Sequence, residues 1–397
     1  MINSGSIIKV PGKLMVAGEY AVLESGHRAV VVAVNRYITA TIKPSLFNEL
    51  SLPQLGLEGI TWNYDEKGME YYLRDDRLSF VKNAMSTAFD YLQEKGIQLH
   101  PFQLQIKSDL NDPVTGKKYG LGSSAAIVVS VIASILTLHG EWEAYEPNEA
   151  LEHQNDEFLI EDEVRKKEKA SFTDKSLLKL FKLSAIAHVK TQRNGSGADI
   201  AACVYGGWLQ YATFRSKWLL SELAKDSSIS NLLEKPWEEL VIKRLSQPKD
   251  LKLMVGWTME SVGTASMVKK IEAFQQENSK IYQEFLDKSF TSVSALIDSF
   301  KKDDINKAME ALFLNRTALL GLGERAGVEI ETKRIKTLCR IADQFGRGKS
   351  SGAGGGDCGI AFIHGDEKVK ALWLEWKEAG ILPLDLLVAQ KGCTVLQ

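Results

Sequence analysis

Residues 120–138 of this chain read GLGSSAAIVVSVIASILTL, and this stretch decides the fold. Its two glycines permit left-handed backbone conformations, and the apolar run behind them is too short to cross a bilayer. Ser123 and Ser124 stand where the run begins, and we expect them to occupy the cap and the first turn of a helix, where serine is common. The stretch therefore predicts a core helix over residues 125–138 that begins right after Gly122. The N–H groups and the dipole at the start of such a helix bind anions.

The segments on both sides of this helix alternate between apolar and polar side chains, which is typical of strands. The segment 152–184 is highly charged and predicts a solvated helix. We expect strands at Ser6–Val10, Arg28–Val34, Arg36–Lys43, Phe102–Lys107 and Gly206–Phe214.

The second half of the chain reads differently. The strand pattern disappears over Lys217–Asp250, and we place a domain junction there. Apolar residues recur at helical spacing over Gly327–Phe345, which predicts a helix with Gly346 at its C-cap. Strands and helices alternate in both halves, so we expect an α+β fold with two domains, residues 1–225 and 240–397. The other elements predicted here are strands at Leu251–Trp257, Gly359–His364 and Ile381–Val388 and a helix at Glu367–Glu378.

Composition excludes several classes of function. The 397 residues carry a net charge of −2, without the basic surplus of a nucleic-acid binder or a membrane-surface protein. The cysteines at positions 203, 339, 358 and 393 form no CxxC pair, and the histidines form no HExxH motif. We therefore expect reduced thiols and no zinc site. The N-terminal residues lack the apolar core of a secretory signal, so we expect a cytoplasmic protein that binds neither nucleic acid nor membranes.

Glycine is concentrated in three places. These are residues 120–126 (GLGSSAA), 194–199 (NGSGAD) and 346–359 (GRGKSSGAGGGDCG). Glycine lets backbone N–H groups approach a ligand closely, and successive N–H groups form a site for anions. Three such segments with Lys, Ser and Asp embedded in them indicate phosphate chemistry.

Three better-known glycine motifs do not fit these segments. GLGSSA matches the loose dinucleotide-binding pattern, but that pattern needs a strand directly before it, and the turn-rich residues 108–119 intervene. Gly348–Ser350 resembles the end of a Walker A loop, but Asp343 stands where that loop requires glycine. Residues 348–352 match the GxSxG pattern of serine hydrolases, although a helix and not a strand is predicted before them.

Three segments together resemble the signature motifs of the GHMP kinases, the superfamily of galactokinase, homoserine kinase, mevalonate kinase and phosphomevalonate kinase. We call them the first motif (residues 10–24, VPGKLMVAGEYAVLE), the second motif (120–126, GLGSSAA) and the third motif (350–361, SSGAGGGDCGIA). Their order and spacing match over essentially the whole chain. Within the superfamily, GKKYGLGSSAA, GSGADIAACVYGGWLQY and GWT are most similar to the bacterial type of phosphomevalonate kinase.

The resemblance implies a fold and an activity. The fold would be an N-terminal ribosomal-protein-like α/β domain and a C-terminal ferredoxin-like domain, with the active site in the cleft between them. The activity would be ATP-dependent phosphorylation of 5-phosphomevalonate to 5-diphosphomevalonate, with Mg²⁺ accompanying ATP. The partners would be these small molecules alone, and the protein would be a monomer or a homodimer.

The resemblance also implies roles for individual residues. Lys13 would neutralise charge on the transferred phosphoryl group, and Asp199 would face the acceptor, so these two are the candidate catalytic residues. The hydroxyls of Ser123 and Ser124 would reach the Mg²⁺ ion. The ATP phosphates would lie on Gly120, Leu121, Gly122, Ser123, Ser124 and Ala125.

The acceptor would lie against the first and third motifs. Arg347 and Lys349 supply positive charge that suits a phosphorylated acceptor better than an alcohol. The full candidate set for the acceptor is Lys13, Tyr20, Arg347, Lys349, Ser350, Ser351, Gly352, Ala353 and Gly354.

Two departures from the family pattern stand out. His188 occupies the position of a magnesium-binding glutamate in related mevalonate kinases, and imidazole is a poor ligand for Mg²⁺. In GWTMESVGTAS, Met259 replaces the usual glycine, so we assign this segment no role. Other readings stay open: a sibling activity such as mevalonate kinase or another small-molecule kinase, or a catalytically inactive binding module. The presence of Lys13, Ser123, Ser124 and Asp199 together favours an enzyme.

Overall fold

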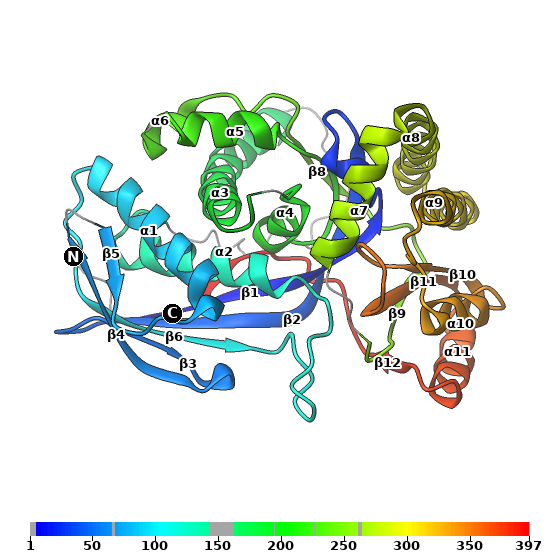
Figure 1. Cartoon of the computed structure of the whole chain (residues 1–397), viewed down its shortest axis with the longest axis horizontal. Helices are drawn as coiled ribbons and strands as arrows, with labels where there is room; N and C mark the ends of the chain where they lie inside the picture. Colours follow the sequence, from blue (N-terminus) through cyan, green and yellow to red (C-terminus); the bar gives the residue numbers. More distant parts are fainter. Residues whose placement is uncertain are drawn as a thin grey trace.

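The computed structural model describes residues 5–65, 68–142, 162–193, 195–225, 228–260 and 264–396. Over these residues the chain forms a larger and a smaller sheet, both mostly antiparallel, with helices packed against them (Figure 1). The predicted α+β class is confirmed.

The larger sheet has the strand order β13-β1-β2-β6-β3-β4-β5, and β7 and β8 extend it beside the first half of β2. One long strand, β2, replaces the two strands predicted on either side of Asn35. The predicted break is a bulge in β2, because the adjacent residues Pro11 and Gly12 of β1 pair with Tyr37 and Val34. The strands of this sheet are β1 (Ser6–Ala17), β2 (Arg28–Pro44), β3 (Glu49–Leu52), β4 (Leu57–Asp65), β5 (Gly68–Tyr71), β6 (Phe102–Ser108), β7 (Trp208–Ala212), β8 (Val241–Leu245) and β13 (Thr394–Leu396).

Helices cover one face of the larger sheet (Figure 1). The central one is α2 (Ser123–Leu138), which packs on β1 and β2 and is buried along most of its length. This confirms the core helix predicted behind Gly122, because an all-apolar helix is stable only when it is enclosed. It contacts α1 (Ser79–Glu94), α3 (Asp162–Gln192) and α4 (Ala198–Tyr205), while α5 (Ser216–Leu223) and α6 (Ile229–Glu234) pack on α3.

The charged segment 152–184 is only partly as expected. Residues 152–161 lie outside the described part of the chain. From Asp162 onward the segment is helical, as predicted, but Leu180, Phe181 and Leu183 are buried in the core rather than solvated. These apolar residues follow the charged stretch, and α3 packs against α1 and α2.

The smaller sheet has the order β10-β11-β9-β12. Helices α10 and α11 cover one side, while α9 packs on β10 (Figure 1). The strands of this sheet are β9 (Leu251–Trp257), β10 (Gly346–Ser350), β11 (Cys358–His364) and β12 (Leu382–Leu384). The helices in this part of the sequence are α7 (Thr264–Glu277), α8 (Ser279–Lys301), α9 (Ile305–Ala326), α10 (Lys333–Ala342) and α11 (Glu367–Glu378).

Gly346 is not the helix cap that its position predicted. The helix α10 ends at Ala342, and Gly346 opens strand β10. A Cβ at this position would lie 2.0 Å from the carbonyl oxygen of Phe362 on β11. The glycine is required by this close approach of two strands, which a helical periodicity cannot reveal.

The two sheets do not divide the chain in sequence order. Strand β8 pairs with β7, and the last strand, β13, returns to pair with β1. The larger sheet therefore takes strands from both sides of the junction expected between residues 225 and 240. Near the ends of β1, β9 and β10, Met15 contacts Ser351 and Thr258 contacts Asp357, so the first and third motifs lie together.

Candidate active site

Lys13 lies on β1 against the start of α2. Its backbone N–H donates to the carbonyl of Leu121 at 2.9 Å, and a Cβ at Gly122 would lie 2.8 Å from its Cε atom. The lysine side chain thus runs along Gly122, where any larger residue would displace it. Its Nζ atom forms no hydrogen bond or ion pair with a described residue. The charge is therefore available to a ligand at the start of α2.

The second motif forms the turn before α2 as expected. Gly120 and Gly122 adopt positive φ angles of 82° and 79°, and Gly122 is the N-cap. No side chain caps this helix end, so the prediction that a serine would cap it is wrong. The hydroxyls of Ser123 and Ser124 bond to no described residue, whereas Ser130 further along the helix donates back to Ile127. The N–H groups of the first turn also have no partner within the helix.

Asp199 occupies the first turn of α4, where the helix dipole favours a negative charge. One of its oxygens, Oδ1, accepts from the N–H of Ile200 at 3.0 Å. The preceding NGSGAD segment is anchored through Ser196, whose carbonyl accepts from Tyr211 and from Thr213. The glycine-rich segment before α4 therefore serves to place Asp199.

Cys203 lies one turn after Asp199 on α4 and bonds to Pro11, two residues before Lys13 on β1. Burial raises the pKa of Cys203, Asp199 raises it further, and Lys13 lowers it. Both charges thus lie within electrostatic reach of Cys203, which stays protonated and whose Sγ donates to the carbonyl of Pro11 at 3.1 Å. Cys358 is similar, since burial raises its pKa and its Sγ donates to the carbonyl of Tyr119 at 3.0 Å. The four cysteines are free and buried.

The third motif lies against the first. Ser351 Oγ donates to the carbonyl of Met15 at 2.8 Å, and the hydroxyl of Tyr20 donates to the carbonyl of Ala353 at 2.6 Å. Tyr20 has a positive φ of 59°, and burial raises the pKa of its hydroxyl, so the hydroxyl remains a donor. Tyr20, Ser351 and Ala353 are therefore brought together, as a shared site requires.

Lys349 requires a correction. Its side chain is 0% exposed, and its Nζ atom forms an ion pair with Glu19 and donates to the carbonyl of Ser350 at 3.0 Å. Ser350 is buried as well. Neither side chain is exposed to receive an acceptor phosphate. The sequence could not predict this burial, because the partner, Glu19, lies far away in the sequence and is also buried.

Arg347 points elsewhere. It is exposed, its guanidinium lies 5.5 Å from the ring centre of Phe313 on α9, and it donates to the carbonyl of Gly346. It contacts none of the other candidate site residues in the described part of the chain.

The glycines of the third motif differ in the space around them. A Cβ at Gly354 would lie 2.3 Å from the carbonyl oxygen of Ile330, and one at Gly356 would lie 2.7 Å from that of Glu260. Gly352 has a positive φ of 80° and open space beside it. Gly352 is thus the one of these three glycines with room for a ligand, while the other two allow the loop to pack.

The end of the third motif contacts the second motif. A Cβ at Gly120 would lie 2.6 Å from the Cβ of Asp357, which has a positive φ of 54°. The carbonyl of Asp357 accepts from the N–H and the hydroxyl of Thr258. Glu19 belongs to the first motif and Thr258 to the GWT segment, which was assigned no role. The sequence could not show their partners, Lys349 and Asp357.

His188, which stands where a metal ligand was looked for, is buried with its ring 5.2 Å from that of Phe80. The described residues include no group of three or more His, Cys, Asp or Glu side chains that could hold a metal ion. They also include no helix long and apolar enough to cross a membrane.

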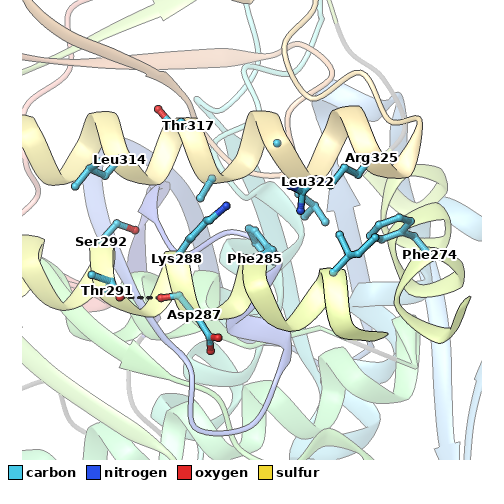
Figure 2. Close-up of a pocket in the computed structure, with 13 residues that line it drawn as sticks. Phe274, Phe285, Asp287, Lys288, Thr291, Ser292, Leu314, Thr317, Leu322 and Arg325 are labelled. Carbon is cyan, nitrogen blue, oxygen red and sulfur yellow. Dashed lines mark hydrogen bonds between the residues drawn. The ribbon is translucent and has the colours of Figure 1, made fainter. Parts of the chain in front are cut away.

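A separate cavity lies between α8 and α9 (Figure 2). Its volume is about 460 Å³, and its lining includes Phe285, Lys288, Leu322 and Arg325. None of the candidate site residues lines it.

Comparison with known proteins agrees with this geometry. The family model described as GHMP kinases C terminal matches residues 296–382. A Lin0012 protein from Listeria innocua has a similar structure, with a TM-score of 0.83 and 36% identity over 99% of this chain and 100% of that one. The phosphomevalonate kinase of Streptococcus pneumoniae, solved in complex with phosphomevalonate and AMPPNP, has a TM-score of 0.77 and 26% identity over 96% and 99% of the two chains.

The sequence comparison extends over nearly the full length. A phosphomevalonate kinase of Streptomyces sp. (strain CL190) is 30% identical over 96% of this chain and 96% of its own. The three signature motifs contact one another in the structure. This chain therefore belongs to the phosphomevalonate kinase family of the GHMP kinases.

Proposed function

We propose that the protein transfers the γ-phosphoryl group of ATP to the phosphate of 5-phosphomevalonate, which gives 5-diphosphomevalonate and ADP on the mevalonate route to isoprenoids. Family membership supports this, as does the similarity to a kinase solved with phosphomevalonate and a nucleotide analogue. The observation that carries the proposal is the position of Lys13, which lies along Gly122 at the start of α2 and whose Nζ atom has no partner among the described residues.

The nucleotide phosphates would lie on residues 120–125. Two features of the second motif fit them: the N–H groups of the first helical turn, which have no partner within the helix, and the hydroxyls of Ser123 and Ser124, which bond to no residue that the structure describes. The same hydroxyls, with Asp199, are oxygen donors of the kind that Mg²⁺ prefers. The bound ion would neutralise charge on the phosphates being transferred.

The acceptor phosphate would lie between Lys13 and the third motif. Gly352 offers open space, and Lys13 supplies the positive charge. Lys349 is paired with Glu19, and Arg347 lies over Phe313 on α9, so both of these charges have other partners. The protein would act on these small molecules as a cytoplasmic monomer or homodimer.

Asp199 would position Lys13 and the metal and would not be an obligatory base. A kinase that phosphorylates an alcohol must remove a hydroxyl proton, but the second pKa of a phosphate monoester is about 6, so the acceptor is already ionised at pH 7. The remaining difficulty is to bring two anions together, which requires positive charge and N–H groups.

A direct assay tests the proposal. The purified protein is incubated with ATP, Mg²⁺ and either phosphomevalonate or mevalonate, and ADP release is followed while ³¹P NMR identifies the product. We expect ADP and a diphosphate with phosphomevalonate only. Turnover of mevalonate alone would indicate the sibling activity, and turnover of neither would favour a binding module.

A further inference from the structure

A buried ion pair joins the two sheets beside the candidate site. Glu19 follows β1 of the larger sheet, and Lys349 lies on β10 of the smaller one. Their side chains are 2% and 0% exposed, and they are 330 residues apart in the sequence. No step of the proposed reaction uses either of them.

The pair belongs to a regular series of contacts. Lys349, Ser351 and Ala353 are alternate residues at the start of the glycine loop 351–356. Each contacts the first motif: Lys349 contacts Glu19, Ser351 contacts Met15 at 2.8 Å, and Ala353 contacts Tyr20 at 2.6 Å. One edge of the loop is thus attached to the segment that carries Lys13.

Of these contacts the ion pair is the most sensitive to loss. Charges in a protein interior have lost their hydration, so each depends on its partner. The second oxygen of Glu19, Oε2, has no hydrogen-bond partner among the described residues. Removal of Lys349 would leave this carboxylate buried with no compensating charge, whereas removal of both charges would leave none.

We propose that Glu19 and Lys349 are positioning residues that hold the glycine loop 351–356 against the first motif, so that Gly352 faces the phosphate bound by Lys13. This inference rests on the proposed function for its kinetic consequences. Lys349 acts through Glu19 and the loop, and it does not bind the acceptor phosphate itself.

Three variants test the coupling: Lys349→Met, Glu19→Gln and the double variant. We expect Lys349→Met to lower Tm by about 5–10 °C, to lower kcat and to raise KM for phosphomevalonate, each at least about 10-fold, with the Kd for ADP unchanged. Amide hydrogen exchange in residues 351–356 should accelerate. The double variant should regain at least half of the lost Tm and approach wild-type exchange and kinetics, because the unpaired carboxylate is gone.

Lys182→Met is the matched control. Lys182 is also a buried lysine, and its Nζ donates to the carbonyls of Leu233 and Lys235, away from the three motifs. This variant should lose Tm but keep kcat, both KM values and the exchange rate of residues 351–356. Equal kinetic losses in Lys182→Met would mean that Lys349 contributes only stability, and would overturn the proposal.

Two further outcomes would also overturn it. If KM for phosphomevalonate stays as high in the double variant as in Lys349→Met, Lys349 is a direct ligand. If Lys349→Met does not fold, Glu19→Gln and the double variant still decide: a double variant that also fails to fold, beside a folded Glu19→Gln, would show that no coupling exists, because Lys349→Met would then be equally harmful without the carboxylate. A wild-type protein inactive on phosphomevalonate would refute the proposed function alone, because Tm and hydrogen exchange measure the coupling without substrate.

Discussion

The second and third motifs are both rich in glycine and serine, yet the structure uses them in opposite ways. In the second motif the hydroxyls of Ser123 and Ser124 bond to no described residue. In the third motif Ser351 donates to Met15, and Lys349, which directly precedes the motif, is paired with Glu19. The composition of the two segments is similar, so only the state of their polar groups distinguishes a segment that awaits a ligand from one that is held by the protein.

The largest effect should come from the charge beside the second motif. Lys13→Met should lower kcat by about 10²–10³-fold, since one stabilising group at a transferring phosphoryl is lost, while Tm changes little because Nζ has no described partner. Lys9→Met on the same strand, where Nζ lies over the ring of Tyr37, should leave kcat unchanged. Steady-state kinetics and thermal melts measure both. A kcat for Lys13→Met within about threefold of wild type would contradict the view that the second motif awaits a ligand.

Asp199 gives the next largest effect and tests its role. Asp199→Asn should lower kcat by about 100-fold, as for loss of a charged group that orients others. The deficit should stay constant from pH 7 to pH 9, because the acceptor is already ionised in that range. The wild-type rate should fall as pH drops below about 6, where the acceptor phosphate gains a proton. A variant rate that rises tenfold per pH unit above pH 7, beside a flat wild type, would mean that Asp199 removes a proton.

Ser124 offers a sharper test of the second motif. Ser124→Ala should lower kcat or raise KM for ATP by about 10- to 150-fold, the value of one charge-assisted hydrogen bond, with Tm unchanged because no side chain caps α2. Ser130→Ala is the matched control on the same helix, since its hydroxyl is already bonded to Ile127 at 2.8 Å. Wild-type kinetics in Ser124→Ala would show that its hydroxyl takes no part in binding the nucleotide.

The smallest effect should appear in the third motif. Tyr20→Phe removes the bond to Ala353, worth about 1 kcal/mol, and should lower Tm by about 2–4 °C and raise KM for the acceptor only a few-fold. Tyr91→Phe on α1 loses a comparable bond to Glu141, so its Tm should fall similarly with no change in kinetics. A loss in Tyr20→Phe as large as that in Lys13→Met would place Tyr20 in direct contact with the acceptor.

Much of the local structure could be predicted from the sequence. The helix behind Gly122, the strands β6, β9 and β11, and the helix α11 follow from side-chain periodicity, which is a short-range property of the backbone. Glycines at positive φ likewise mark turns that other residues adopt only with strain. The three motifs themselves indicated both the family and the places where phosphate chemistry would be found.

Only the tertiary structure decided how these pieces are used. Lys349 and Arg347 are alternate residues on one strand and look equivalent in the sequence, yet one is buried against Glu19 and the other lies exposed over Phe313. The pairing of the last strand, β13, with β1 is equally impossible to predict from the local sequence. Such outcomes depend on packing between residues hundreds of positions apart. A local pattern can predict that a side chain is charged, but its partner and its burial are set by the whole fold.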